Sequence, residues 1–277
     1  MKNLVPRILS GIIYMGLIIL GTTGQSWLFA GLMGMFMLFC LIEYVRLTEL
    51  SDKLYTVLMF IGSAGIFYFF SNYLFSQQSA FLLQSLSFIG PIMFLLAAFT
   101  ILFSSNELYI EFGKATIGVI YIAVPFSLAL TIPSISFELG KEIISNEILL
   151  IFLLIWFSDV MAYVAGSLFG KHKLAPKISK NKSWEGFFGG FISTIIVGTL
   201  LEFYVFPKSK LNWVIISTII AICAPVGDLV ESKLKRTFNA KDSGNFIPGH
   251  GGFLDRLDSF IFVVPMVYLY LLLNNIL

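Results

Sequence analysis

The sequence predicts an all-α fold, a polytopic bundle of about nine helices that cross a membrane. Apolar residues make up 57% of the 277 positions and charged residues only 12%, about half of the roughly 25% typical of soluble domains. Nine stretches are long and apolar enough to span a bilayer, which takes about 20 residues. Basic residues are concentrated in alternate connections between these stretches, as in proteins whose cytoplasmic loops are rich in Lys and Arg.

The first predicted helix covers residues 4–22 and is accompanied by two basic residues, Lys2 and Arg7. A basic start followed by an apolar stretch is also the outline of a secretory signal peptide. The stretch lacks a clear Ala-x-Ala cleavage site, and the rest of the chain is itself rich in membrane-spanning stretches. We therefore expect the first helix to be retained.

The remaining predicted helices follow one another through short connections. In order, they occupy residues 26–46, 54–75, 80–104, 115–135, 146–170, 184–206, 211–232 and 254–276. Several contain Gly or Pro, which membrane helices tolerate because neighbouring helices satisfy the backbone groups that are freed. We expect no separate soluble domain, and we divide the chain into N-terminal helices (1–145) and a C-terminal catalytic region (146–277).

The distribution of Lys and Arg predicts the orientation. With the N-terminus in the cytoplasm, 15 of the 18 basic residues fall on the cytoplasmic side. The two longest basic connections, 171–183 and 233–253, then lie together on that side, and the C-terminus lies outside. We expect a multi-pass protein of the cytoplasmic (inner) membrane whose active site faces the cytoplasm.

Acidic residues lie inside the predicted helices of the C-terminal region. One Asp at the centre of a membrane helix costs about 2.5–3.5 kcal/mol on insertion scales, so several together need compensation. Asp228 and Glu231 share one helical face at i and i+3, and Asp255 and Asp258 do the same on the next helix. Two such faces can meet around a hard divalent cation, which prefers oxygen ligands. The candidate metal ligands are Asp159, Asp228, Glu231, Asp255 and Asp258.

A set of ion pairs is the structural alternative to a metal site. It would join Glu231 to Lys235, and Asp255 or Asp258 to Arg256. The adjacent Asp255 and Arg256 point to different faces of a helix, which weakens this alternative.

Both basic connections could contact phosphate groups. The connection at 171–183 packs five lysines into twelve residues and ends in a helix-starting Ser183. Such a run is often only a membrane anchor, and charge-preserving changes at its ends, Lys171 and Lys182, are expected to have little effect. The connection at 233–253 adds glycines to its basic residues. Glycines let the backbone approach a ligand closely, and amides at a helix N-terminus attract phosphate oxygens. Its His250 is as consistent with a structural hydrogen bond as with a phosphate contact.

The run from Ser232 to Asp258, SKLKRTFNAKDSGNFIPGHGGFLDRLD, resembles the signature of phosphatidate cytidylyltransferases, also called CDP-diacylglycerol synthases. That signature reads S-x-hydrophobic-K-R, four residues, K-D-x-G, then P-x-H-G-G-hydrophobic-x-D-R-hydrophobic-D. Every fixed position is present. The resemblance extends upstream through residues 158–186 and weakly to 4–11, whereas between about 20 and 145 only the hydropathy pattern is similar.

The resemblance implies a Mg²⁺-dependent transfer of the cytidylyl group from CTP to phosphatidic acid, with CDP-diacylglycerol and pyrophosphate as products. It also implies a homodimer in the lipid bilayer, with a polar cavity open to the cytoplasm and to lipid. Carboxylates matching Asp228, Asp255 and Asp258 would hold the metal centre, and a monovalent cation is a candidate for a second position. We expect no nucleic-acid partner.

The residue patterns and the resemblance together give two further sets of candidate residues. The candidate catalytic residues are Lys235, Arg236, Lys241, Asp242, His250 and Arg256. The candidate substrate-binding residues are Lys173, Lys177, Lys180, Ser232, Gly251 and Gly252.

Two other functions would use similar groups. A CTP-dependent polyprenol or phytol kinase would transfer the γ-phosphoryl group to an alcohol, but the complete signature argues against it. A cation transporter would also carry carboxylates within the membrane, but it would not need the Lys-Arg and glycine-rich connection. Label in the α-phosphate of CTP would enter lipid only with a cytidylyltransferase.

Overall fold

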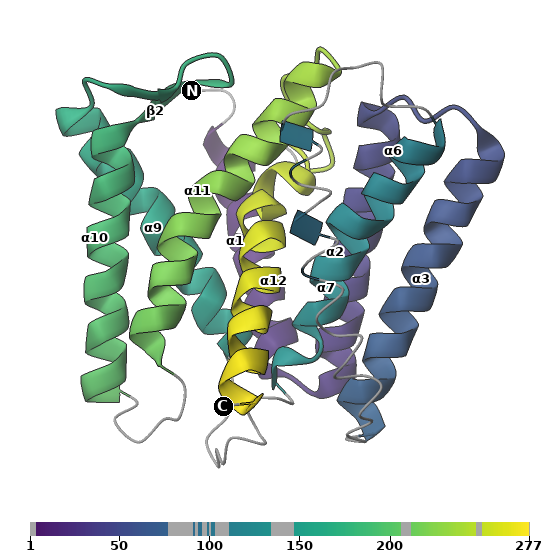
Figure 1. Ribbon diagram of the computed structural model, residues 1–277, viewed down its shortest axis with the longest axis horizontal. Coiled ribbons are helices and arrows are strands. Elements are labelled where there is room, and N and C mark those ends of the chain that lie inside the picture. Colours follow the sequence, from purple (N-terminus) through teal and green to yellow (C-terminus); the bar gives the residue numbers. More distant parts are fainter. Residues whose placement is uncertain are drawn as a thin grey trace.

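The computed structural model describes residues 4–76, 91, 94–95, 99, 101–102, 111–133, 147–205, 212–247 and 251–276, and these are almost entirely helical (Figure 1). The helices are α1 (Leu4–Thr23), α2 (Ser26–Leu47), α3 (Lys53–Ser76), α6 (Glu111–Gly118), α7 (Val124–Ala129), α9 (Glu147–Phe169), α10 (Trp184–Leu200), α11 (Trp213–Thr237) and α12 (Leu254–Ile276). Two π-helical segments, η2 (Val119–Ala123) and η3 (Leu201–Val205), continue α6 and α10. Two short strands, β1 (Lys173–Ala175) and β2 (Ser179–Ser183), form an antiparallel hairpin.

Most of the predicted spans correspond to a helix of the structure. Seven spans are long and apolar enough to cross a membrane: Ser26–Leu47, Lys53–Ser71, Glu111–Ala129, Glu147–Phe169, Trp184–Val205, Trp213–Thr237 and Leu254–Asn274. Helix α1 contributes a shorter apolar stretch, Leu9–Thr23. The predicted span at 80–104 lies mostly outside the described residues. The all-α, multi-pass membrane fold is therefore confirmed, whereas the number of nine spans stays a prediction.

Helix α12 lies at the centre of the bundle, where it packs against α11 and α7 and also contacts α2 and α9 (Figure 1). Its residues Val263 and Val264 are fully buried. On the outer helices, large apolar side chains such as Ile61 of α3 and Ile192 of α10 are exposed, as expected where helices face lipid. The start of α12, which carries Asp255 and Asp258, therefore belongs to a helix that is packed against several others.

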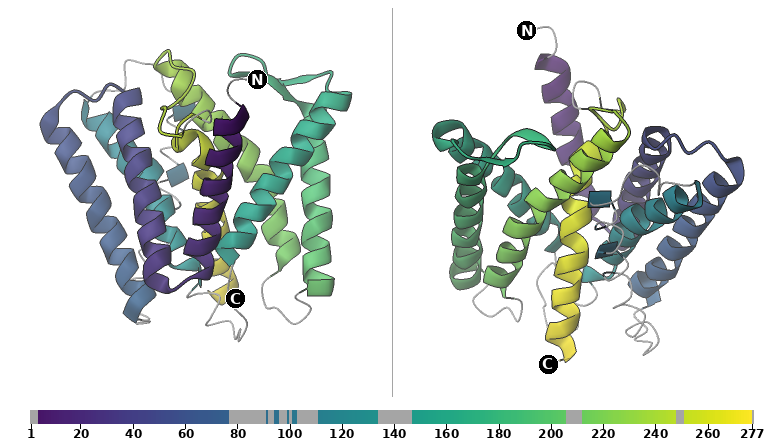
Figure 2. Two further views of the ribbon diagram at one scale, coloured as in Figure 1. Left: turned by 180° about the vertical axis from the view of Figure 1, so that it is seen from behind. Right: turned by 45° about the horizontal axis from the view of Figure 1, so that its top comes forward.

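The two basic connections lie at the same end of the bundle. The hairpin and the segment after α11 are near the start of α1, and the end of α12 lies at the opposite end (Figure 2). The prediction that residues 171–183 and 233–253 share one side of the membrane agrees with this arrangement.

Small residues bring the C-terminal helices close together. A Cβ atom at Gly227 of α11 would lie 2.6 Å from the backbone oxygen of Asp258 in α12. A Cβ at Gly190 of α10 would lie 3.0 Å from the backbone oxygen of Ser158 in α9. Small residues at such positions permit close helix packing in membranes, where apolar burial alone drives association weakly. The close approach at Gly227 places its neighbour Asp228 beside α12.

The start of α10 is as predicted, and it follows a hairpin for which no prediction was made. The Ser183 hydroxyl accepts a hydrogen bond from the Gly186 amide at 3.2 Å and caps α10. The Glu185 carboxylate accepts from the amides of Lys171 and His172. Residues 171–183 were predicted only as a basic connection, and no apolar alternation marks the two short strands within it.

Candidate active site

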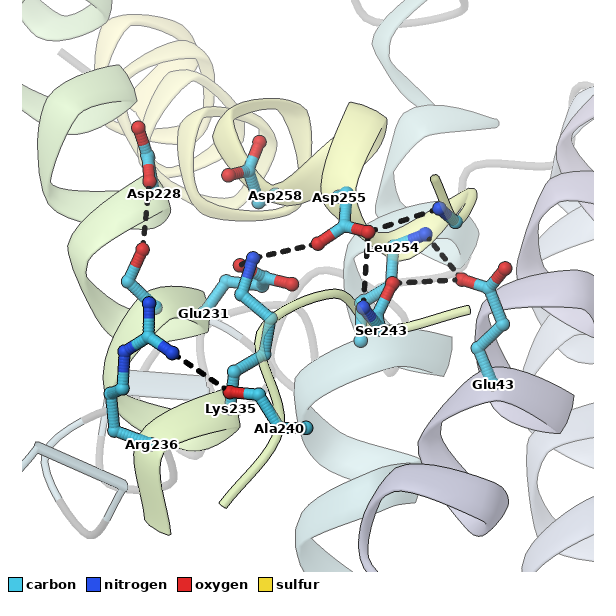
Figure 3. A network of polar contacts seen from close by, with 12 residues as sticks. Glu43, Asp228, Glu231, Lys235, Arg236, Ala240, Ser243, Leu254, Asp255 and Asp258 are labelled. Carbon is cyan, nitrogen blue, oxygen red and sulfur yellow. Dashed lines mark hydrogen bonds and ion pairs between the residues drawn. The ribbon is translucent and has the colours of Figure 1, made fainter. Parts of the chain in front are cut away.

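The acidic faces of α11 and α12 meet near the basic end of the bundle (Figure 3). Asp228, Glu231 and Lys235 follow one another at helical spacing on α11 and face Asp255 and Asp258 of α12. Helical spacing predicted each face, and the structure shows that the two faces meet.

Lys235 links the two faces through ion pairs. Its ammonium group contacts a carboxylate oxygen of Glu231 and lies 2.6 Å from Asp255 Oδ1. The Glu231 side chain is fully buried, and those of Lys235 and Asp255 are nearly so. The ion pair between Glu231 and Lys235 is the one that the structural alternative to a metal site proposed. The negative charges of both carboxylates are thus balanced in part by Lys235.

Lys182 enters the site from the hairpin and pairs with Asp228. Its ammonium group lies 2.6 Å from Asp228 Oδ2 and donates to the backbone oxygen of Pro225 at 3.2 Å. Ser232 also donates to Asp228, through its hydroxyl at 3.1 Å from Oδ1. Charge-preserving changes at Lys182 were expected to have little effect; that prediction is untested, but the contact with Asp228 adds Lys182 to the candidate site residues. The pairing across the hairpin, which spacing along the chain does not reveal, directs this lysine over α11.

Three carboxylates from three helices are subject to one another's charges or to that of Lys182. Asp159 of α9 is subject to the charges of Asp228, Lys182 and Arg256. Asp258 of α12 is subject to those of Asp228, Asp159 and Lys182, and its side chain is buried. Asp258 Oδ1 accepts from the Ser259 amide at 2.7 Å. Asp159, which is distant along the chain, therefore belongs to the same cluster.

The carboxylate cluster fits a hard cation in the kind of ligand it offers. Within the described ranges, the structure contains no group of three or more His, Cys, Asp or Glu side chains arranged to hold a metal ion. Glu231 Oε1 is buried and has no hydrogen-bond partner among the described residues. A water molecule or cation would satisfy a buried oxygen of this kind. A metal at Asp228 would share that carboxylate with Lys182.

The start of α12 is occupied by protein carboxylates. Asp255 Oδ2 accepts from the amides of Ser243 and Gly252, both at 3.0 Å. Glu43 of α2 accepts from the amides of Phe253 and Leu254 at 3.0 and 2.8 Å. The helix N-terminus that the sequence analysis offered to phosphate thus already binds side chains of this chain.

Sequence reasoning did not find Glu43, which comes from the N-terminal helices rather than from residues 146–277. The sequence feature that could have identified Glu43 was an acidic residue near one end of a mainly apolar predicted span. Such a charge requires a partner within the membrane. The partner could not be named without the packing of α2 against α12.

Other predicted residues lie outside this buried network. Arg236 is exposed and donates to the backbone oxygen of Ala240 at 3.0 Å, which closes the turn after α11. Gly251 has a φ of 88°, a left-handed conformation that favours glycine. Among the candidate residues predicted from the sequence, six have exposed side chains: Lys173, Lys177, Arg236, Lys241, Asp242 and Arg256. His250 and the side chain of Lys180 lie outside the described residues.

Comparison with known proteins identifies relatives across almost the whole chain. The model of the cytidylyltransferase family matches residues 5–274. The phosphatidate cytidylyltransferase of Bacillus subtilis (strain 168) is 33% identical over 276 residues, which are 98% of this chain and 97% of that protein. The protein of the same name from Staphylococcus haemolyticus (strain JCSC1435) is 38% identical over 180 residues, 65% of this chain and 66% of the relative. That of Staphylococcus aureus (strain COL) is 36% identical over 181 residues, with the same coverage.

Proposed function

The chain belongs to the cytidylyltransferase family, and we propose that it transfers the cytidylyl group of CTP to phosphatidic acid. The products are CDP-diacylglycerol and pyrophosphate, as the names of its relatives imply. The observation that best supports this function is the meeting of the acidic faces of α11 and α12, with Asp228 paired to Lys182 of the hairpin. Carboxylates that bind a divalent cation, with lysines beside them, suit a polyanionic nucleotide at a membrane.

The chemistry asks for charge neutralisation more than for a strong base. The nucleophile is a phosphate oxygen of phosphatidic acid, which is largely ionised at neutral pH because the second pKa of a phosphomonoester is near 6. It must approach the α-phosphorus of CTP, and pyrophosphate must leave. Positive groups fixed before the reaction lower this electrostatic barrier. We assign that role to Lys182 and Lys235, with the exposed Arg236, Lys241 and Arg256 as further phosphate contacts.

We propose that Asp228 and Asp258, together with Asp159, hold Mg²⁺. Mg²⁺ held by these residues would supply positive charge that offsets the repulsion between the phosphate groups. The charges that these carboxylates exert on one another support the proposal, because a cation among them would relieve that repulsion. Asp255 and Glu231 instead hold Lys235 between them.

One reaction separates this function from its alternatives. Purified protein in detergent, with phosphatidic acid, Mg²⁺ and CTP labelled in the α-phosphate, is expected to move label into lipid. CTP labelled in the γ-phosphate is expected to release that label as pyrophosphate only. A lipid kinase would give the opposite pattern, with γ-label in lipid and no α-label. Absence of lipid labelling from both forms of CTP would contradict the proposed function.

We also propose that the protein resides in the cytoplasmic membrane with its active site facing the cytoplasm, and that it is a homodimer. The orientation is supported by the 15 of 18 basic residues that fall on one side. It is also supported by the position of the hairpin at the end of the bundle where α1 begins (Figure 2). The homodimer rests on the family resemblance alone.

Cysteine labelling tests the orientation. Cysteines introduced at the exposed Pro176 and Asn245 are expected to react with an impermeant thiol reagent in inside-out vesicles but not in intact cells. A cysteine appended after Leu277 is expected to react in intact cells. The parent protein, whose Cys40 is buried and Cys223 half-buried, is the control for background labelling. Reaction of both loop cysteines from outside would show the opposite orientation.

A further inference from the structure

Glu43 is a fully buried carboxylate on α2 that binds the start of α12 and the connection before it. Its Oε1 accepts from the Phe253 amide at 3.0 Å, and its Oε2 accepts from the Leu254 amide at 2.8 Å. The hydroxyl of Ser243 donates to Oε2 at 3.1 Å (Figure 3). A negative charge at this place is favourable because the N-terminus of a helix carries partial positive charge. The contacts join residues about 200 positions apart in the chain.

Two glycines of the connection leave room for this carboxylate. A Cβ atom at Gly244 would lie 2.5 Å from Glu43 Oε1, and its three nearest neighbours would all be Glu43 atoms. A Cβ at Gly252 would collide with Glu43 and with Ser243. Neither glycine has a positive φ, so space rather than backbone conformation accounts for glycine at both positions. The segment is therefore shaped around Glu43.

The same face of α2 holds the connection at two further points. Phe39 stacks on Phe253 with ring centroids 4.7 Å apart, and the Arg46 guanidinium lies 5.1 Å from the ring centroid of Phe246. Positions 39, 43 and 46 follow at i, i+4 and i+7, the spacing of one helical face. A face of α2 thus carries an aromatic, an acidic and a basic contact to one segment.

The position of α12 decides where its acidic residues lie. Leu254, bound by Glu43, immediately precedes Asp255, and Asp258 follows one turn later. We propose that Glu43 is a positioning residue for the reaction: by binding Ser243, Phe253 and Leu254 it holds Asp255 against Lys235 and Asp258 beside Asp228. This role rests on the proposed function. Glu43 acts through the backbone of α12 and is not assigned a contact with substrate.

Kinetics per folded molecule test the proposal. Glu43→Ala is expected to lower kcat at least tenfold with less than a threefold change in KM for CTP, because misplaced carboxylates affect the transition state more than nucleotide binding. Glu43→Gln, which keeps the size and one acceptor oxygen, is expected to lose less. Activity is divided by the amount of monodisperse protein after size exclusion, so a loss of folding alone would leave kcat unchanged.

Glu202 offers a matched control. It is another carboxylate that accepts from amides at the start of a helix, those of Trp213 and Val214 in α11. It lies at the other end of α11 from Lys235. Glu202→Ala removes an equivalent cap and is expected to leave kcat within twofold. Equal losses in Glu43→Ala and Glu202→Ala would reduce Glu43 to a general stabilising residue and overturn the proposal.

A double-mutant cycle tests the coupling through Gly244. Gly244→Ala alone is expected to resemble Glu43→Ala, because the added methyl group displaces the carboxylate. In the Glu43→Ala background the same change is expected to alter kcat less than twofold, because its collision partner is gone. Independent, multiplicative losses would contradict the proposal.

Hydrogen exchange provides a readout that does not depend on activity. The amides of Phe253 and Leu254 are expected to exchange faster in Glu43→Ala than in the parent protein. If the parent protein failed to transfer cytidylyl groups, the proposed function would fall, but exchange would still decide whether Glu43 anchors α12. Unchanged exchange at both amides would refute the anchor itself.

Discussion

Asp228→Asn and Asp258→Asn will each lower kcat by on the order of 100-fold or more, the scale observed when one group that stabilises transition-state charge is removed. Asn keeps the size of the side chain but removes the negative charge. At Asp228 the change breaks the ion pair with Lys182, and at Asp258 it removes a buried member of the three-carboxylate cluster. Both changes also remove a proposed Mg²⁺ ligand.

Initial rates of α-label transfer at several Mg²⁺ concentrations measure this prediction. Asp52 provides the control because it is exposed and its carboxylate accepts from the nearby amides of Leu54 and Tyr55, away from the site. Asp52→Asn is expected to stay within twofold of the parent protein. Turnover close to normal at saturating Mg²⁺ in either site variant would remove that residue from the proposed ligand set.

Lys182→Met will lower kcat/KM at least 100-fold, the second large effect that we expect. Met keeps much of the length and the apolar stem but lacks the ammonium group. Its loss leaves the carboxylates of Asp159, Asp228 and Asp258 with less positive charge nearby. It also removes a cation proposed to neutralise phosphate. Lys182→Arg is expected to be intermediate, because a planar guanidinium does not reproduce the geometry of an ammonium group.

Lys171→Met is the matched control, because Lys171 is an exposed lysine of the same basic connection. Its contact with Glu185 is made by the backbone amide, which the substitution keeps. We expect less than a twofold change in kcat/KM. Similar losses at Lys171 and Lys182 would indicate that this connection only anchors the protein to anionic lipid, where one cation replaces another.

The sequence by itself determined the fold class. An apolar content of 57% with 12% charge cannot cover a water-exposed surface. A backbone surrounded by lipid must satisfy its hydrogen bonds within helices or closed barrels, and stretches of about 20 apolar residues have the length of a spanning helix. Features within one helix were also predictable, because the helical repeat alone puts Asp228, Glu231 and Lys235 on one face. Ser183 before Glu185 likewise marked the start of α10.

Only the tertiary structure decided which faces meet. Lys235 could pair with Glu231 on its own helix by spacing alone, but its second partner, Asp255, depends on how α11 and α12 pack at Gly227. Arg236, adjacent in sequence, instead turns to the backbone of Ala240.

Lys182 and Glu43 also make contacts that the sequence alone did not predict, with partners farther away along the chain. The pairing of β1 with β2 brings Lys182 to Asp228. Glu43 reaches α12 from about 200 residues away. The physical reason is that helical periodicity is set by local backbone geometry, whereas contacts between elements depend on side-chain volume and close packing throughout the bundle.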